Sequence, residues 1–331
     1  MRTPMTSLAL ATAIATAAFG SHAQSQPAYP TKPIELIVPS GPGGGADISA
    51  RLLANYLSKK KGITINVVNK TGGATIIGMN YVMTSAPDGY TMLADAHAFA
   101  SLLPVVSPSL PFDWRKRTWI AKISDDIPIY LVQMTSPWKT LDDVAQFAQA
   151  NPAKLRWGTA TPNGISAAAI VQFFGASGVP PTNVASTHVV LKSGAEVLVG
   201  LAGGHFDFAA QQASEATGMI QGGKVRALAV VSKERLKEIP DVPTVTEVGH
   251  PKLNVIGWHG LSGPPALPDH IKKFWVEATE DATKDPVFLE NLLAANKVPA
   301  YVSSKEFETF VEREYVMYQE VFSYMKKDAG K

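Results

Sequence analysis

The sequence predicts an α/β protein with two lobes, each built on an open, mainly parallel sheet, joined by a hinge. Short apolar runs, which suit buried parallel strands, alternate with segments whose apolar residues repeat at helical spacing. This alternation occurs in two stretches of the 331-residue chain, and no low-complexity linker separates them. Such an order predicts open sheets with helices on their faces. We expect residues 28–126 and 255–331 to form lobe 1 and residues 127–254 to form lobe 2.

The first stretch begins with a strand over 34–39, IELIVP, and continues with a helix over 47–57. The apolar residues of this helix share one face: Ile48, Leu52, Leu53 and Leu57. A second strand follows over 64–69, and residues 70–95 read as a loop, a helix, a turn at Pro-Asp-Gly and a third strand. These elements predict a parallel sheet in lobe 1.

The second stretch repeats the pattern. Its predicted strands cover 125–134, 155–160, 187–191, 206–211 and 225–231. Its predicted helices cover 140–152, 166–178, 194–204 and 215–223. Extended crossings near 125–130 and 255–261 are expected to act as the hinge, and residues 272–327 read as mainly helical.

The N-terminus has the pattern of a secretory signal peptide over residues 1–23. A basic Arg2 precedes a short apolar stretch, and Ser-His-Ala ends at Ala23 as a small-x-small cleavage site. No later segment has about 18 uninterrupted apolar residues, so no membrane anchor is expected. The chain has no cysteine, which excludes disulfides and thiol catalysis. We therefore expect a periplasmic protein.

The overall charge does not favour a nucleic-acid partner. The formal net charge is +2, and the Lys and Arg residues form no basic stripe. The seven histidines show no metal-ligand spacing, so neither a metal nor a cofactor is expected. The serine-hydrolase motif G-x-S-x-G is also missing, although a triad could still assemble in space.

A glycine loop at Gly41–Ala46 raises several possibilities. GPGGGA fits the dinucleotide pattern G-x-G-x-x-G/A, but the second strand ends in Asn69 and Lys70 instead of an acidic residue for the ribose. A strand, a glycine loop and a helix start together present free backbone N–H groups to an anion. Asp47 would repel an anion directly, and could instead cap the helix or hold the loop's own amides or a water. An anion site and a plain capped turn both remain open.

A second polar loop follows a strand in the other lobe. Residues 158–166, GTATPNGIS, offer neutral hydrogen-bonding groups and open a helix. Two such loops, one from each lobe, would form a ligand site in an interlobe cleft. His97 follows the strand 90–95 and is the histidine best placed to reach that cleft, although a structural role is favoured for it over a ligand contact.

Six motifs in a fixed order carry a family resemblance. They are YPTKPIELIVPSGPGGGADISARLLA, NKTGGATIIG, APDGYTML, GKVRALAVVSKERL, PDVPTVTEVG and GWHGLSGPPALP. From Tyr29 to its end the chain resembles the Bug family, the TctC-like solute receptors of tripartite tricarboxylate transporters. The resemblance implies a two-lobed periplasmic binding protein of type II-like architecture, which closes on a small carboxylate and docks on a membrane permease of that transporter type. A monomer is expected.

The ligand site carries over onto the matching positions. The expected ligand-binding residues are Ser40, Gly41, Gly43, Gly44, Gly45, Asp47, His97, Thr159, Ala160, Thr161, Asn163, Gly164, Ser166, Leu191 and Gln211. Four positions depart from the family pattern. Ser40 replaces an aromatic residue, Ala168 stands near the place of a histidine, Leu191 replaces a tyrosine and Gln211 replaces an aspartate. These changes predict a carboxylate with an apolar or aromatic body rather than an amino acid.

The sequence thus predicts a non-enzymatic periplasmic solute receptor. Two alternatives remain open: a secreted hydrolase that uses the same cleft, and a ligand-sensing receptor for signalling.

Overall fold

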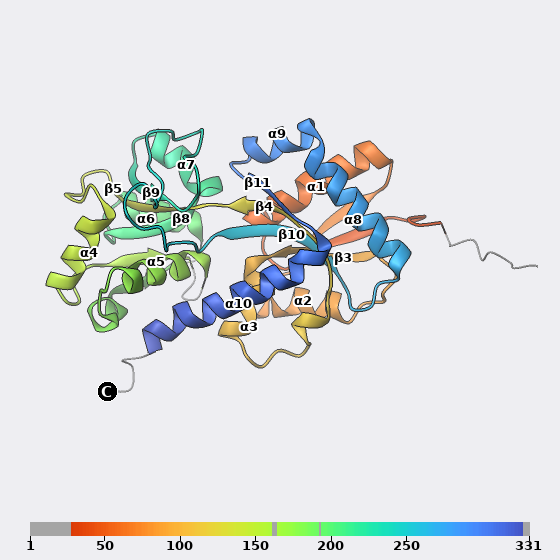
Figure 1. Cartoon of the computed structure of the whole chain (residues 1–331), viewed down its shortest axis with the longest axis horizontal. Helices are drawn as coiled ribbons and strands as arrows, with labels where there is room; N and C mark the ends of the chain where they lie inside the picture. The colour runs from red at the N-terminus through yellow and green to blue at the C-terminus, as the bar shows by residue number, and fades with distance from the viewer. Residues whose placement is uncertain (1–27, 161–163, 192, 327–331) are drawn as a thin grey trace, which may run out of the picture.

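The chain folds around two separate open sheets, and helices cover the faces of each (Figure 1). The structure is a computed structural model, and it describes residues 28–160, 164–191 and 193–326. We call the part built on the six-stranded sheet lobe 1 and the part built on the five-stranded sheet lobe 2. Two open α/β sheets were predicted, and both are present.

The sheet of lobe 1 has the strand order β11-β4-β10-β3-β1-β2. Its strands are β1 Ile34–Val38, β2 Ile65–Asn69, β3 Thr91–Ala96, β4 Thr118–Asp126, β10 Gly257–Gly263 and β11 Val298–Val302. β1 pairs in parallel with β2 and β3, whereas β10 pairs antiparallel with β3 and β4, and β11 antiparallel with β4. The sheet is therefore mixed, and the expectation of a mainly parallel sheet needs correction. The sequence pattern predicts a crossing where β10 lies, and it predicts no strand at β11 or over most of β4.

The helices of lobe 1 pack on this sheet and on one another. They are α1 Gly45–Lys61, α2 Ile76–Met83, α3 Leu103–Val106, α8 Asp269–Lys284, α9 Pro286–Ala294 and α10 Ser304–Lys326, with short 3-10 turns at Gly73–Thr75 and Trp114–Lys116 and a π turn, η2, at Ala98–Leu102. α1 follows the glycine loop and ends at Lys61, and its C-cap Gly62 has a φ of 67°, the left-handed conformation that glycine adopts readily. The glycine loop is thus held between β1 and α1.

The sheet of lobe 2 has the order β7-β6-β8-β5-β9. Its strands are β5 Pro128–Gln133, β6 Trp157–Thr159, β7 His188–Val190, β8 Phe208–Gln212 and β9 Val225–Val230. Its helices are α4 Leu141–Ala150, α5 Ile165–Ala176, α6 Gly194–Ala202 and α7 Ala213–Gln221, with 3-10 turns at Pro181–Asn183 and Ala185–Thr187. β6 pairs in parallel with β7 and β8, and β5 pairs antiparallel with β8 and β9. This sheet is mixed as well.

Two extended crossings connect the lobes where the sequence predicted a hinge. β4 ends at Asp126 and β5 begins at Pro128 in the other sheet, while residues 254–256 lead from lobe 2 into β10 (Figure 1). α10 runs beside these crossings, and its last turns pack on lobe 2 through Tyr318, Val321 and Phe322. Residues 255–331 were predicted to belong to lobe 1, and the packing of the end of α10 on lobe 2 was not predicted.

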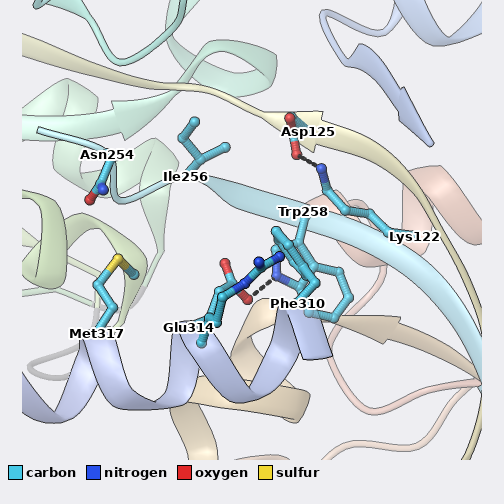
Figure 2. A pocket seen from close by; sticks show the side chains of 9 residues that line it. Lys122, Asp125, Asn254, Ile256, Trp258, Phe310, Glu314 and Met317 are labelled. Atoms are coloured by element: carbon cyan, nitrogen blue, oxygen red, sulfur yellow. Dashed lines mark hydrogen bonds and ion pairs between the residues drawn. The ribbon is translucent and has the colours of Figure 1, made fainter. Parts of the chain in front are cut away.

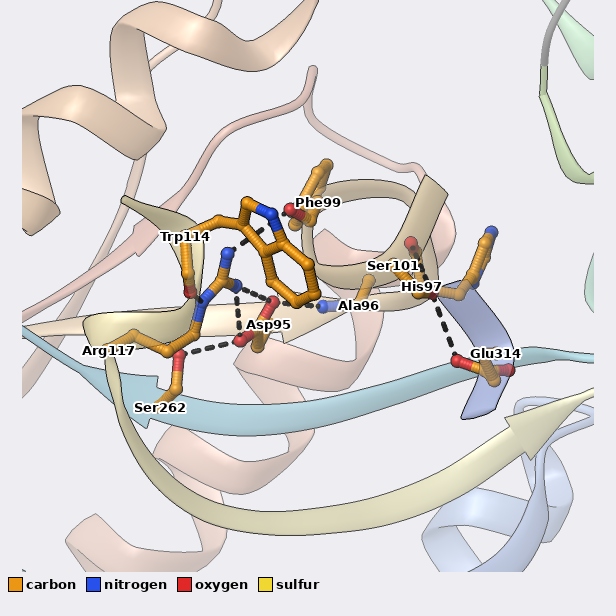
Figure 3. A network of polar contacts seen from close by, with 9 residues as sticks. All are labelled: Asp95, Ala96, His97, Phe99, Ser101, Trp114, Arg117, Ser262 and Glu314. Atoms are coloured by element: carbon orange, nitrogen blue, oxygen red, sulfur yellow. Dashed lines mark hydrogen bonds and ion pairs between the residues drawn. The ribbon is translucent and has the colours of Figure 1, made fainter. Parts of the chain in front are cut away.

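A buried ion pair fixes the interior of lobe 1. Arg117 at the start of β4 lies 2.8 Å from Asp95 on β3, and both side chains are fully buried (Figure 3). Ser262 on β10, the strand between them, donates a hydrogen bond to the same carboxylate at 2.6 Å. Because each buried charge has a partner, the three strands are held in register without an uncompensated charge.

Within the described residues, no helix combines the length and the apolar character needed to cross a bilayer.

Candidate functional site

The first glycine loop presents an open helix start. Gly44 is the N-cap of α1 and has no side-chain cap, so the first N–H groups of the helix keep their hydrogen-bonding capacity. Gly43 has a φ of 78°, which requires glycine or a strained side chain. Gly41, Gly43 and the backbone around them are exposed, and Gly44 and Gly45 are half-buried.

Asp47 stabilises this loop from inside the protein. Its carboxylate accepts hydrogen bonds from the Gly43 N–H at 2.9 Å, from Asn69 at 2.9 Å and from two nitrogens of Arg51. Burial alone would raise the pKa of Asp47, but these hydrogen bonds outweigh it and lower the pKa. The Asn69 amide also donates to the Ser40 carbonyl at 3.0 Å. Asp47 therefore holds the loop's own amide, one of the roles predicted for it, and it does not act as the N-cap.

Gly45 brings the loop against the two interlobe crossings. A Cβ atom at this position would lie 2.9 Å from His259 Nε2 and 3.1 Å from Asp126 Oδ2. His259 is on β10 and Asp126 ends β4, so the loop meets both crossings. Gly44 differs, because a Cβ atom there would lie near only the Gly41 carbonyl oxygen, at 3.5 Å, which is an ordinary van der Waals distance.

In lobe 2, three of the predicted residues come together. Gly164 is the N-cap of α5 and has no side-chain cap, and Ser166 in the first turn donates to Gln211 Oε1 at 3.1 Å. The Gln211 amide in turn donates to the carboxylate of Glu215. A Cβ on Gly194, the first residue of α6, would overlap both Gln211 and Glu215. The starts of α5, α6 and α7 therefore converge on this pair.

Glu215 is not among the residues that the sequence predicts for the site. It is exposed by surface area, yet burial among protein atoms raises the pKa of its carboxyl, and the negative charge of Asp126 adds to the shift. An exposed surface area together with a pKa raised by burial is what we expect for a side chain in a recess that solvent can enter. Its only sequence signal is its position four residues after Gln211, at the start of a helix.

Asp126 joins the two halves of the site. Its Oδ2 accepts hydrogen bonds from Ser214 at 2.8 Å and from Lys297 at 3.0 Å. Ser214 is in the first turn of α7 in lobe 2, and Lys297 precedes β11 in lobe 1. No sequence pattern marks these contacts, because the residues are 88 and 171 positions away from Asp126.

The remaining predicted residues have different placements. His97 is buried beside β10, where its Nδ1 accepts the Trp258 N–H at 3.1 Å, and burial lowers its pKa to about 4. Thr159 is fully buried and contacts His188 at 2.6 Å, while Ala160 and Leu191 are half-buried beside it. Thr161 and Asn163 lie outside the described residues. Within the described ranges, no group of three or more acidic, His or Cys side chains is placed to hold a metal.

The arrangement does not form a serine-hydrolase triad at this point. Ser214, Asp126 and His259 lie around the same junction, but the Ser214 hydroxyl donates to Asp126 and not to an imidazole. A triad requires the histidine between serine and carboxylate, as the base that takes the serine proton. The pKa of His259 is held well below its usual value by burial and by Lys297, which keeps it neutral.

Comparisons with known proteins give one consistent result. The model of the tripartite tricarboxylate transporter family receptor matches residues 49–323. A UPF0065 protein of Bordetella pertussis is 29% identical over 91% of this chain and 90% of its own. The solved structure of the periplasmic binding protein BugD is 26% identical, with a TM-score of 0.75, 90% of this chain covered and 99% of that one. A Rhodopseudomonas palustris protein solved with adipate is 23% identical and shares the fold, with a TM-score of 0.80 over 90% of this chain and 99% of that one.

Proposed function

The chain belongs to the tripartite tricarboxylate transporter receptor family, and on this premise we propose that it is a periplasmic solute receptor that binds a small carboxylate between its lobes. The proposal includes removal of residues 1–23 as a signal peptide, and delivery of the ligand by a monomer to a permease of the same transporter type. It includes no catalytic step.

The observation that carries the proposal is the open start of α1 at Gly44 and Gly45. Free N–H groups and the positive end of the helix dipole favour a carboxylate at this point. Gly44 has space beside it, so a ligand can approach the backbone closely. The relative solved with adipate carries a dicarboxylate, which agrees with this chemistry.

Lobe 2 provides the second half of the proposed clamp. The uncapped start of α5 at Gly164 supplies further N–H groups, and Ser166 and Gln211 supply polar side chains. Ala160 and Leu191 are half-buried and pack against the apolar core of lobe 2, and we expect their exposed parts to offer apolar contact to the ligand. We therefore propose a ligand with an apolar or aromatic body. Contacts from both lobes stabilise the closed state and shift an open–closed equilibrium toward it.

Gly44→Val tests the proposal directly. The mature chain, residues 24–331, is first screened with small carboxylates by thermal shift, because a bound ligand raises the melting temperature. Calorimetry with the best ligand then compares the wild type with Gly44→Val and with Gly218→Val, a control at an exposed helix position that also has open space. Gly44→Val should abolish binding without lowering the melting temperature of the empty protein. Unchanged affinity would contradict the proposed clamp.

Two measurements with the same ligand distinguish a transport role from sensing and from hydrolysis. Uptake by cells that lack the receptor should fall, and the ligand should be recovered intact after incubation with the protein. Normal uptake without the receptor would support a sensing role, and conversion of the ligand would support the hydrolase.

A further inference from the structure

A second cavity lies behind the hinge, on the other side of β10 from the glycine loop. It has a volume of about 330 Å³ and lies between the end of β4, the segment before β10 and helix α10 (Figure 2). Trp258 lines it, whereas the next residue, His259, faces Gly45. Consecutive residues of a strand point to opposite faces, so the cavity and the proposed clamp are separate sites. The volume is within the range of small-molecule pockets.

Glu314 is one of the polar residues that line this cavity. Its Oε2 accepts hydrogen bonds from the Trp258 indole and from Ser101, the latter at 3.0 Å (Figures 2 and 3). Burial raises the pKa of this carboxyl to about 8. At neutral pH the group is therefore mostly protonated, and a protonated carboxyl can donate one hydrogen bond.

Arg313 gives the cavity its net charge. Lys122 also lines it, but its ammonium lies 2.6 Å from Asp125 and is neutralised there. Arg313 forms no ion pair with any residue in the described part of the chain, and its side chain is exposed. With Glu314 protonated, the lining carries one uncompensated positive charge, which favours an anion.

The other walls are apolar. They are formed by Ile256, Trp258, Phe310 and Met317. Figure 2 shows Met317 and Phe310 extending from α10 and Trp258 and Ile256 from the strand and its approach. A ligand for this cavity therefore needs an apolar body and a single anionic end.

We propose that this cavity binds a small organic carboxylate with an aromatic or branched apolar body. The carboxylate pairs with Arg313 and accepts a hydrogen bond from Glu314, and the body packs against Trp258 and Phe310. Charge-assisted hydrogen bonds to a guanidinium are the strongest available to a carboxylate in such a pocket. The site is spatially separate from the clamp at Gly44.

The position of the cavity couples it to lobe closure. Asn254, on one wall, is tied to α5 of lobe 2 by two hydrogen bonds with Gln172, at 2.8 and 2.9 Å. Lys122 and Trp258, on the opposite wall, belong to the sheet of lobe 1. Because the walls move with different lobes, a ligand in the cavity changes the free energy of closure. If the cavity ligand changes the affinity of the clamp for its ligand by some factor, linkage requires that the clamp ligand changes the affinity of the cavity for its own ligand by the same factor.

Benzoate is a suitable probe, with benzamide as its uncharged analogue. Calorimetry on the full mature chain with Gly44→Val, in which the clamp is blocked, should still detect benzoate binding, and benzamide should bind at least about tenfold more weakly. Arg313→Gln should lower the affinity for benzoate by about tenfold or more. Arg235→Gln, which removes an exposed arginine of lobe 2 paired with Glu247, should leave the affinity unchanged.

A second pair of variants tests the location. Met317→Trp fills the cavity and should abolish benzoate binding, whereas Val316→Trp, at the neighbouring exposed position of α10, should not. The proposal is overturned if benzoate does not bind, if benzamide binds equally well, or if Arg313→Gln and Met317→Trp leave the affinity unchanged. If Gly44→Val fails to block the clamp, the Met317 and Val316 pair in the wild-type background still decides the question.

Discussion

Lys297 Nζ lies 3.0 Å from Asp126 Oδ2, and neither side chain has more than 3% of its surface exposed. The pair joins β11 of lobe 1 to the first interlobe crossing. Ser214 adds a hydrogen bond from lobe 2 to the same oxygen. A buried charge pair thus lies where the chain crosses from one lobe to the other.

Lys297→Met should destabilise the protein strongly. It leaves Asp126 as a buried charge without a cation, and breaking such a pair costs about 3–5 kcal/mol. Urea unfolding measures the change. The double variant Lys297→Met/Asp126→Asn should recover most of the loss, because both charges are removed together. If the double variant is no more stable than the single one, the ion pair does not explain the effect.

Glu215→Gln should change how clamp affinity depends on pH. The pKa of Glu215 is raised, mainly by burial and also by the charge of Asp126, whereas the hydrogen bond from Gln211 and the charge of Lys297 oppose the rise. An incoming carboxylate would raise it further, so binding is accompanied by proton uptake and weakens as pH rises through the pKa of Glu215. Calorimetry over a pH series should show this slope in the wild type and a flatter one in Glu215→Gln. Equal slopes in the two proteins would place Glu215 outside the clamp.

Gly194→Ala should lower the affinity of the clamp for its ligand with little effect on the stability of the protein. The added methyl group must displace the flexible ends of Gln211 and Glu215, which meet at this point. We expect a loss of about tenfold in affinity, equivalent to roughly 1.4 kcal/mol. Gly218→Ala is the matched control, since nothing lies within 4 Å of its added Cβ. The same loss in the control would show that the effect is not local.

Glu314→Gln should reduce the pH dependence of stability. The pKa of Glu314 is raised from 4.5 to about 8, so the folded state binds more protons than the unfolded state between these values. Wild-type stability should therefore fall as pH rises from about 4.5 to about 8, with this group contributing at most about 1.4 kcal/mol per pH unit. Urea unfolding at about pH 5, 6.5 and 8 should show the flatter profile in the variant. The glutamine can still accept from Trp258 and Ser101, so folding is preserved.

The sequence predicts many of the individual helices and strands, but it does not predict how the strands pair. β1, α1 and β2 follow from apolar periodicity and from the glycines at the helix ends. β10 and β11 were missed because β10 contains three glycines and β11 is a short strand between helices. Their antiparallel pairing with β4 made the sheet mixed, and that pairing depends on chain segments more than about 100 residues apart.

What the sequence determined by itself is the two-lobed α/β class, the family and the two loops that open α1 and α5, because each depends on local periodicity, glycine positions or motif order. Only the tertiary structure decided which groups share the junction between the lobes. Asp126, Ser214, Glu215 and Lys297 have no pattern in sequence, yet they meet there because two crossings and three helix starts converge. The cavity at Glu314 has the same origin: its carboxyl acquires an unusual pKa only when α10 buries it against Trp258.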